Sequence, residues 1–256
     1  SSDLVYQVPH LAHATMEPCN ATVQLAPDRI DIWMGTQAAL WCTKLAAQLA
    51  DLKPEQAYLH NCYVGGGFGR KTRGDELKHA VGVAKVVGNR PVKLIWTREE
   101  DMRNDKYRPQ AAIRFQGGLD ASGKMTTLHM QSAVGAIGAA AVANPKMVDR
   151  QAMDGLADSV VYTKVPNWFL GVNMKNTHVP VAFWPSVGGS QNGFFMESFI
   201  DEMAHAAGKD PVAFRRSLTD RPDVLGVLEM AAQKGDWGKP LPKGKGRGFA
   251  IVDSFG

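Results

Sequence analysis

A glycine-rich stretch from Asn61 to Lys71 constrains this chain more than any other feature. It reads Asn-Cys-Tyr-Val-Gly-Gly-Gly-Phe-Gly-Arg-Lys and follows an apolar run that is typical of a strand. Glycine has no Cβ, so this backbone can adopt positive φ and lie directly against a bound group. Successive N–H groups in such a loop suit phosphate or an oxo anion. Phe68 among the glycines indicates a pocket wall rather than a flexible linker; a ligand-free turn between a strand and a helix is the alternative.

The glycine-rich stretch differs by one residue from each of two common nucleotide-binding motifs. A P-loop requires glycine directly before Lys-Ser or Lys-Thr, but Arg70 precedes Lys71 and Thr72. The dinucleotide fingerprint G-x-G-x-x-G requires a third glycine, and Arg70 or Thr72 occupies that position in the two possible registers. The loop is therefore not expected to bind ATP or NAD.

Composition places the chain among ordinary globular proteins and excludes several partners. With 256 residues, 45% of them hydrophobic and 21% charged, it can form one large domain or two small ones. A net charge of +4 without a basic stripe argues against nucleic acid as a partner. No apolar run is long enough for a membrane span. The three cysteines, Cys19, Cys42 and Cys62, are far apart and predict buried free thiols.

Alternating and helical periodicities predict an α+β fold of mixed sheets with packed helices. The predicted strands are residues 21–25, 29–33, 58–64, 91–96, 111–119, 125–133 and 179–184. The predicted helices are residues 38–50, 75–87, about 191–207 after a Ser190 cap, a helix begun by Asp210 and Pro211, and 223–234. A helical turn capped by Thr97 is expected, residues 134–160 are left open between loop and helix, and residues 235–248 are expected to form a surface loop.

The N-terminal region allows two interpretations. His10, His13 and Cys19 are residue types that zinc accepts, but no fourth ligand follows at a useful spacing. A buried structural turn is the favoured alternative. At the other end, residues 251–256 are strand-like, and we expect this chain to be a segment of a longer polypeptide.

With these residues in view, the chain resembles the molybdenum hydroxylase family, which includes xanthine oxidase and aldehyde oxidase. It is most similar to the large, molybdopterin-binding subunit of bacterial isoquinoline 1-oxidoreductase-like enzymes. The segments that carry the resemblance occur in the family's order: Met16–Pro18, Thr36-Gln37, Val64–Lys71, Trp96–Asp101, Ser186–Gln191 and Glu197–Glu202.

The resemblance implies a fold, a cofactor and partners. Residues 1–240 would form the first molybdopterin-binding domain, in two α+β subdomains, and 241–256 a linker and the start of the next domain. The cofactor would be molybdopterin with molybdenum, in its cytosine dinucleotide form. Such enzymes hydroxylate an N-heteroaromatic ring or an aldehyde with water as the oxygen source. Electrons would pass to [2Fe-2S] clusters on a partner subunit or domain, and the remaining molybdopterin-binding domain or chain would be a second partner.

The resemblance also assigns roles to residues. Gln37 would hydrogen-bond an oxo ligand of the metal, and the N–H groups of Phe68 and Gly69 would face the metal's ligands. Gly66, Gly67 and Arg70 would lie along the pterin or its phosphates. Trp184 and Val187 would line the substrate pocket, with a packed loop as the alternative.

Departures from the family pattern limit what the resemblance implies. No residue of this chain would bind the metal directly, and the catalytic glutamate is expected outside the chain. Xanthine oxidases carry Arg and Phe in the loop around Trp184, Pro185 and Val187, so purine hydroxylation is not expected. A catalytically incomplete domain that binds cofactor or serves assembly is the competing hypothesis.

Overall fold

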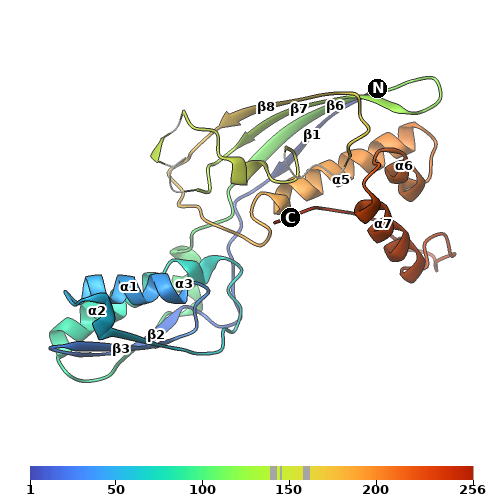
Figure 1. Ribbon diagram of the computed structural model, residues 1–256. Coiled ribbons are helices and arrows are strands. Elements are labelled where there is room, and N and C mark those ends of the chain that lie inside the picture. Colours follow the sequence, from blue (N-terminus) through green and yellow to red (C-terminus); the bar gives the residue numbers. More distant parts are fainter. Residues whose placement is uncertain (139–142, 145, 158–161, 256) are drawn as a thin grey trace. The chain divides into compact units, whose positions relative to one another are not determined.

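The computed structural model describes residues 1–138, 143–144, 146–157 and 162–255, which form two compact units. The first unit contains Ser1–His10, Pro109–His178 and Ser186–Gly256, and the second contains Leu11–Arg108 and Val179–Pro185. Each unit has its own four-stranded mixed sheet with helices (Figure 1). The predicted α+β class is thereby confirmed, while the domain limits at residue 240 stay a prediction.

The second unit is built on the sheet order β4-β3-β2-β5. Its strands are β2 (Asn20–Ala26), β3 (Arg29–Met34), β4 (Ala57–Asn61) and β5 (Val92–Ile95). The β3–β4 pair is parallel, whereas β2 pairs antiparallel with β3 and β5. Alternate strand residues such as Val23 and Ile32 are buried in one core with apolar residues of α1 (Ala39–Leu49) and α2 (Asp75–Val87). Each helix therefore forms because an apolar stripe meets the apolar face of the sheet.

The parallel pair determines where the glycine-rich loop lies. Residues 35–38 leave the end of β3, and the loop leaves the end of β4, so both connections emerge at the same edge of the sheet. The Cys62 N–H continues the pairing for one residue, donating to the Met34 carbonyl at 3.0 Å. The loop then passes through the short helix η2 (Arg70–Thr72) into α2. Ligands of open α/β sheets bind beyond the carboxyl ends of parallel strands, which is the position of this loop.

The first unit is built on the sheet order β1-β6-β7-β8. Its strands are β1 (Ser2–Val8), β6 (Ala111–Leu119), β7 (Met125–Val134) and β8 (Asn167–Met174), and only the β7–β8 pair is parallel. The buried face of α5 (Gly189–Ala206) packs on this sheet, and Gly117 permits close approach because an added Cβ would lie 2.6 Å from the Met203 sulfur. Helices α6 (Pro211–Ser217) and α7 (Pro222–Lys234) follow α5 (Figure 1).

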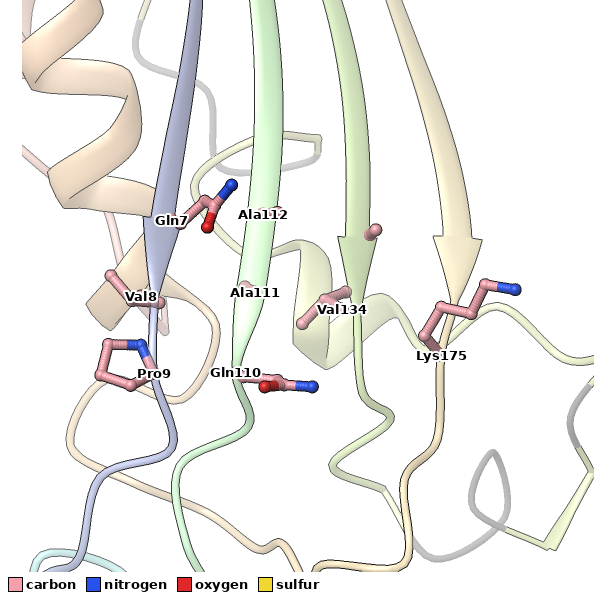
Figure 2. Close-up of a pocket in the computed structure, with 9 residues that line it drawn as sticks. Gln7, Val8, Pro9, Gln110, Ala111, Ala112, Val134 and Lys175 are labelled. Carbon is pink, nitrogen blue, oxygen red and sulfur yellow. The ribbon is translucent and has the colours of Figure 1, made fainter.

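A hollow of about 590 Å³ lies at one end of this sheet (Figure 2). Small side chains of the sheet, among them Ala111 and Ala112, leave the space, and Gln7, Gln110 and Lys175 lie at the strand ends around it (Figure 2). None of the predicted site residues lines this hollow.

Several elements differ from their sequence-based predictions. The strands β1 and β8 were not predicted, and residues 179–184 form only one bridge, Tyr107 to Val181, instead of a strand. Helix α5 begins at Gly189 with Gly188 as its N-cap, so the predicted Ser190 cap is wrong. Cys62 is exposed, against the prediction of three buried thiols, whereas Cys19 and Cys42 are buried.

The other predictions for local structure have clear outcomes. The hairpin formed by β6 and β7 is confirmed, as is the Thr97 cap of α3 (Arg98–Arg103), where the Glu100 N–H donates to Thr97 Oγ1 at 3.2 Å. The open region 134–160 contains the short helix η3 (Arg150–Met153), and residues 139–142, 145 and 158–160 lie outside the described residues. In the described part of the chain, no helix is both long and apolar enough to span a bilayer.

Candidate cofactor-binding loop

Glu17 fixes the start of the glycine-rich loop. Its N–H donates to the Gly65 carbonyl at 3.0 Å, and its Oε2 accepts from the Gly65 N–H at 2.9 Å. The ammonium group of Lys71, whose side chain is 1% exposed, donates to the same oxygen. Burial raises the pKa of the Glu17 carboxyl, but the hydrogen bonds from Lys71 and Gly65 outweigh it and hold the pKa below its ordinary value. The two ends of the loop are thus joined by one carboxylate.

The backbone of the loop presents its own N–H groups. Gly66, Phe68 and Gly69 have φ values of 97°, 55° and 99°, all in the left-handed region. The N–H groups of Gly66, Gly67 and Phe68 donate to no group in the part of the chain that the structure describes. The Phe68 side chain is 49% exposed. Three successive N–H groups without an acceptor among the described residues, beside an exposed ring, suit an anionic or oxo group.

Gln37 lies directly against this loop. Its side-chain Oε1 accepts from the Gly69 N–H at 3.0 Å, and its backbone N–H donates to the Lys71 carbonyl at 3.1 Å. A Cβ at Gly67 would overlap the Gln37 amide, so only glycine leaves this amide in place. The Gln37 Nε2 atom has no hydrogen-bond partner among the described residues and remains available as a donor. The structure therefore brings together Gln37 and the glycines, as the sequence predicted.

The Arg70 side chain points into the protein interior. It is fully buried, with Nη1 donating to Asp75 at 3.0 Å and Nε 3.0 Å from Asp105 Oδ1, where the geometry makes an ion pair but no hydrogen bond. The guanidinium also lies 5.4 Å from the ring centroid of Trp96. Arg70 thus anchors the end of the loop to the core of the second unit, and its guanidinium is not presented on the loop surface.

A buried histidine links the loop to the segment Val179–Pro185. His13 Nδ1 lies 2.9 Å from Asp105 Oδ1, and His13 Nε2 donates to the Phe183 carbonyl at 2.7 Å. Burial raises the pKa of the Asp105 carboxyl, but the hydrogen bonds from the His13 side chain and N–H outweigh it and leave the pKa lowered. The same Phe183 carbonyl oxygen lies where a Cβ of Gly69 would be.

The two predicted pocket residues belong to different units. Trp184, in the second unit, is partly buried; its ring lies 6.4 Å from that of His13, and its indole nitrogen has no hydrogen-bond partner among the described residues. Val187, in the first unit, is 8% exposed and has φ 51°, which is rare for a β-branched residue and indicates local strain. Their role in a substrate pocket stays a prediction.

A metal site in the N-terminal turn is not supported. The described residues contain no cluster of three or more His, Cys, Asp or Glu side chains that could hold a metal ion. His13 uses both ring nitrogens for contacts inside the second unit. The favoured alternative, a buried structural turn, holds in part, because His13 and Cys19 are buried whereas Ala14 and Met16 are exposed.

Sequence reasoning missed the residues that brace the loop. Glu17 was noted only within a motif, Lys71 only as a source of positive charge in the glycine-rich stretch, and His13 and Asp105 were given no role in the loop. Because the structure buries Lys71, this lysine requires an acidic partner, but the local sequence showed neither its burial nor its partner. Partners separated by 54 residues, such as Lys71 and Glu17, come together only in the tertiary fold.

Together, the fold and the loop define an α+β protein whose glycine-rich loop lies beyond the carboxyl ends of two parallel strands. A family model described as the molybdopterin cofactor-binding domain matches residues 2–218. The chain belongs to this family.

Two curated relatives match nearly the whole chain at 30% identity or more. The chain is 30% identical to isoquinoline 1-oxidoreductase subunit beta of Brevundimonas diminuta, over 98% of this chain and 32% of that protein. It is 31% identical to the membrane-bound aldehyde dehydrogenase [pyrroloquinoline-quinone] of Gluconacetobacter polyoxogenes, over 98% of this chain and 35% of that protein. The chain therefore spans about a third of the length of these curated relatives.

The solved structures support the fold. Aldehyde oxidoreductase from Desulfovibrio gigas matches with a TM-score of 0.72 at 18% identity, covering 91% of this chain and 27% of that one. Quinoline 2-oxidoreductase from Pseudomonas putida 86 matches with a TM-score of 0.72 at 18% identity, covering 92% of this chain and 32% of that one.

Proposed function

We propose that this chain is part of a molybdenum-dependent hydroxylase that oxidises an N-heteroaromatic ring or an aldehyde with water as the oxygen source. The observation that carries the proposal is the row of three N–H groups at Gly66, Gly67 and Phe68, beside the Gln37 amide nitrogen, all without a hydrogen-bond partner among the described residues. Membership in the molybdopterin cofactor-binding family identifies the class of anionic group that such a row suits.

The residues present fit a molybdopterin cofactor. The backbone N–H groups and the Gln37 amide are neutral donors held in fixed positions, which is how a protein stabilises charge on oxygen atoms without rearrangement. Gly67 has no Cβ, so the Gln37 amide can lie directly against the loop. When bound, the molybdenum centre supplies the two-electron oxidation, and the residues of this chain bind and orient it.

The remaining predicted residues take supporting roles. Phe68 provides an exposed aromatic wall beside the N–H row, and Trp184 and Val187 are proposed to limit access for substrate. Arg70 is proposed to hold the loop from behind through Asp75 and Asp105 rather than to touch the cofactor with its guanidinium. Because Gly69 donates its N–H to Gln37, we assign the direct backbone contacts to Gly66, Gly67 and Phe68.

We propose two partners for this chain. One is the remaining molybdopterin-binding domain or chain, which would contribute the catalytic glutamate. The other is an iron–sulfur subunit or domain whose [2Fe-2S] clusters accept the electrons. The cytosine dinucleotide form of the cofactor is part of the same proposal.

The test is an analysis of the native complex that contains this chain. Molybdenum is measured by metal analysis, and the pterin and its nucleotide are identified after acid release. We expect molybdenum and pterin in stoichiometric amounts, and a pyrroloquinoline quinone in their place would refute the proposal. Cofactor without turnover of benzaldehyde or isoquinoline would favour the cofactor-binding or assembly module instead.

A matched pair of variants tests the role of Gln37. Replacing Gln37 by Ala removes one neutral hydrogen bond to the bound centre, so we expect turnover to fall by about tenfold or more. Gln48, exposed on α1, is the control, and Gln48→Ala is expected to match the wild type. Equal turnover of the Gln37 and Gln48 variants would show that Gln37 does not contact the reacting centre.

A further inference from the structure

The loop belongs to a closed ring of contacts within the second unit. Arg70 follows Gly69 in the chain, and its Nε lies 3.0 Å from Asp105 Oδ1. Asp105 holds His13 twice, accepting from the His13 N–H at 2.6 Å and lying 2.9 Å from its Nδ1. His13 Nε2 donates to the Phe183 carbonyl at 2.7 Å. That carbonyl oxygen in turn packs against Gly69, where an added Cβ would overlap it.

The contact between Phe183 and Gly69 limits how the loop can turn. Gly69 has φ 99°, and an added Cβ there would overlap the Phe183 carbonyl oxygen. A movement of that carbonyl would let Gly69 and the preceding Phe68 rotate, because glycine tolerates many backbone conformations. The Gly69 N–H, which donates to Gln37, would move with it. We therefore expect the position of the Phe183 carbonyl to limit where the loop's N–H groups and the Gln37 amide lie.

His13 is built to hold that carbonyl still. Its side chain is 1% exposed, and Asp105, 2% exposed, orients the ring so that Nε2 faces Phe183. A hydrogen bond between partners that are already oriented costs little conformational entropy. Breaking it is costly, because the partly buried Phe183 carbonyl would then be left without this donor. Trp184, the next residue, has its ring 6.4 Å from the His13 ring and tilted by 42° to it.

We propose that His13, oriented by Asp105, is a positioning residue that sets the geometry of the cofactor loop through the Phe183 carbonyl. This inference rests on the proposed function for the identity of the bound centre, and it adds a residue that touches neither the loop's free N–H groups nor Gln37. His13 acts indirectly, because the Phe183 carbonyl that it holds contacts Gly69, and Gly69 contacts Gln37.

Two substitutions separate the two hydrogen bonds of His13. The amide of a glutamine reaches to the place of Nε2, so His13→Gln keeps a donor for the Phe183 carbonyl. The shorter amide of an asparagine reaches to the place of Nδ1. His13→Asn therefore keeps the contact with Asp105 and loses the hydrogen bond to the Phe183 carbonyl. Both variants keep a polar side chain in the same buried position, which makes each the control for the other.

The experiment uses the native complex with wild-type, His13→Gln and His13→Asn chains. The readouts are molybdenum content, the Mo(V) electron paramagnetic resonance signal after dithionite reduction, and hydrogen exchange of the peptide that covers Gly65–Arg73. We expect His13→Asn to keep molybdenum, to shift the Mo(V) signal and to exchange about tenfold faster in this peptide. We expect kcat for benzaldehyde or isoquinoline to fall by about 10- to 100-fold with little change in KM, because small misplacements near the reacting centre cost that much. His13→Gln is expected to match the wild type in all of these.

The outcomes are distinct. An unchanged Mo(V) signal and unchanged exchange in His13→Asn would overturn the positioning role. If His13→Asn does not accumulate, His13→Gln decides: a wild-type signal and exchange rate support the role, and a shifted signal or faster exchange overturns it. A wild-type complex without molybdenum refutes the proposed function, and hydrogen exchange then still tests whether His13 fixes the loop.

Discussion

The pair formed by Glu17 and Lys71 gives the sharpest test of how the loop is held. In a Glu17→Gln variant the amide oxygen can still accept from the Gly65 N–H, but the Lys71 ammonium loses its carboxylate. Breaking a fully buried ion pair costs about 3–5 kcal/mol and a surface pair about 0–1 kcal/mol. The Lys71 side chain is 1% exposed but that of Glu17 is 33% exposed, so water screens the pair in part. We expect a cost of about 2 kcal/mol, or roughly a 30-fold increase in loop opening.

The assay is hydrogen exchange of the peptide that spans Gly65, measured in the subunit with Glu17→Gln, Lys71→Met and the double variant. The double variant has no unpaired charge, so we expect it to be about 1.5 kcal/mol more stable than the sum of the single effects predicts. Because the pKa of Glu17 lies below its ordinary 4.5, its contribution is complete above pH 4.5 and is lost as pH falls through the folded-state pKa. The acid-induced loss of protection should be absent in Glu17→Gln. Additive single effects at neutral pH would refute the view that this pair holds the loop.

Two further predictions concern the same unit. Gly67→Ala should displace the flexible Gln37 amide with less than about 1 kcal/mol of lost stability, yet lower molybdenum retention. Gly82→Ala, on an open face of α2, is the control: it should add up to about 1 kcal/mol and keep the metal. Glu76 is fully buried, neither of its oxygens has a hydrogen-bond partner among the described residues, and burial raises its pKa. Ionisation of Glu76 therefore lowers the free energy of unfolding, and with it the urea midpoint, as pH rises through the folded-state pKa. The urea midpoint of Glu76→Gln should lack this decline. An equal decline in both proteins would show that Glu76 is not its source.

Local sequence patterns predicted the elements around the loop. The strands β2 and β3 alternate apolar and polar residues around a Pro-Asp turn, and α2 carries its apolar residues at helical spacing. Patterns of this kind depend on neighbours within one element, so they can be recognised without knowing the fold. For the same reason the loop was identified from its glycines; in the structure Phe68 is exposed and Gln37 accepts from the Gly69 N–H, while the cofactor contacts of these residues stay a prediction.

Elements that depend on distant partners were not predicted. The strand β8 carries consecutive exposed residues, including Trp168 and Phe169, and therefore lacks the alternation of a half-buried strand. The strand β1 does alternate, but it pairs with β6 more than 100 residues away. Residues 179–184 are apolar enough for a strand, yet their pairing is limited to one bridge, Tyr107 to Val181, and Phe183 instead contacts His13 and Gly69. Burial and pairing in the tertiary structure outweighed local propensity in β8 and in residues 179–184, whereas the alternation of β1 was present in the sequence and was overlooked.

The site itself combines both kinds of information. The glycines and Gln37 can be recognised locally, and the parallel pairing of β3 and β4 explains why the two connections that carry them emerge side by side. The residues that hold these connections in one geometry come from elsewhere: Glu17 bonds Gly65 and Lys71, and His13 acts through Phe183. A loop rich in glycine is free to adopt many conformations, so a fixed row of N–H groups requires such bracing from outside the loop. The loop residues thus supply the donors, and the residues that sequence reasoning missed determine where those donors point.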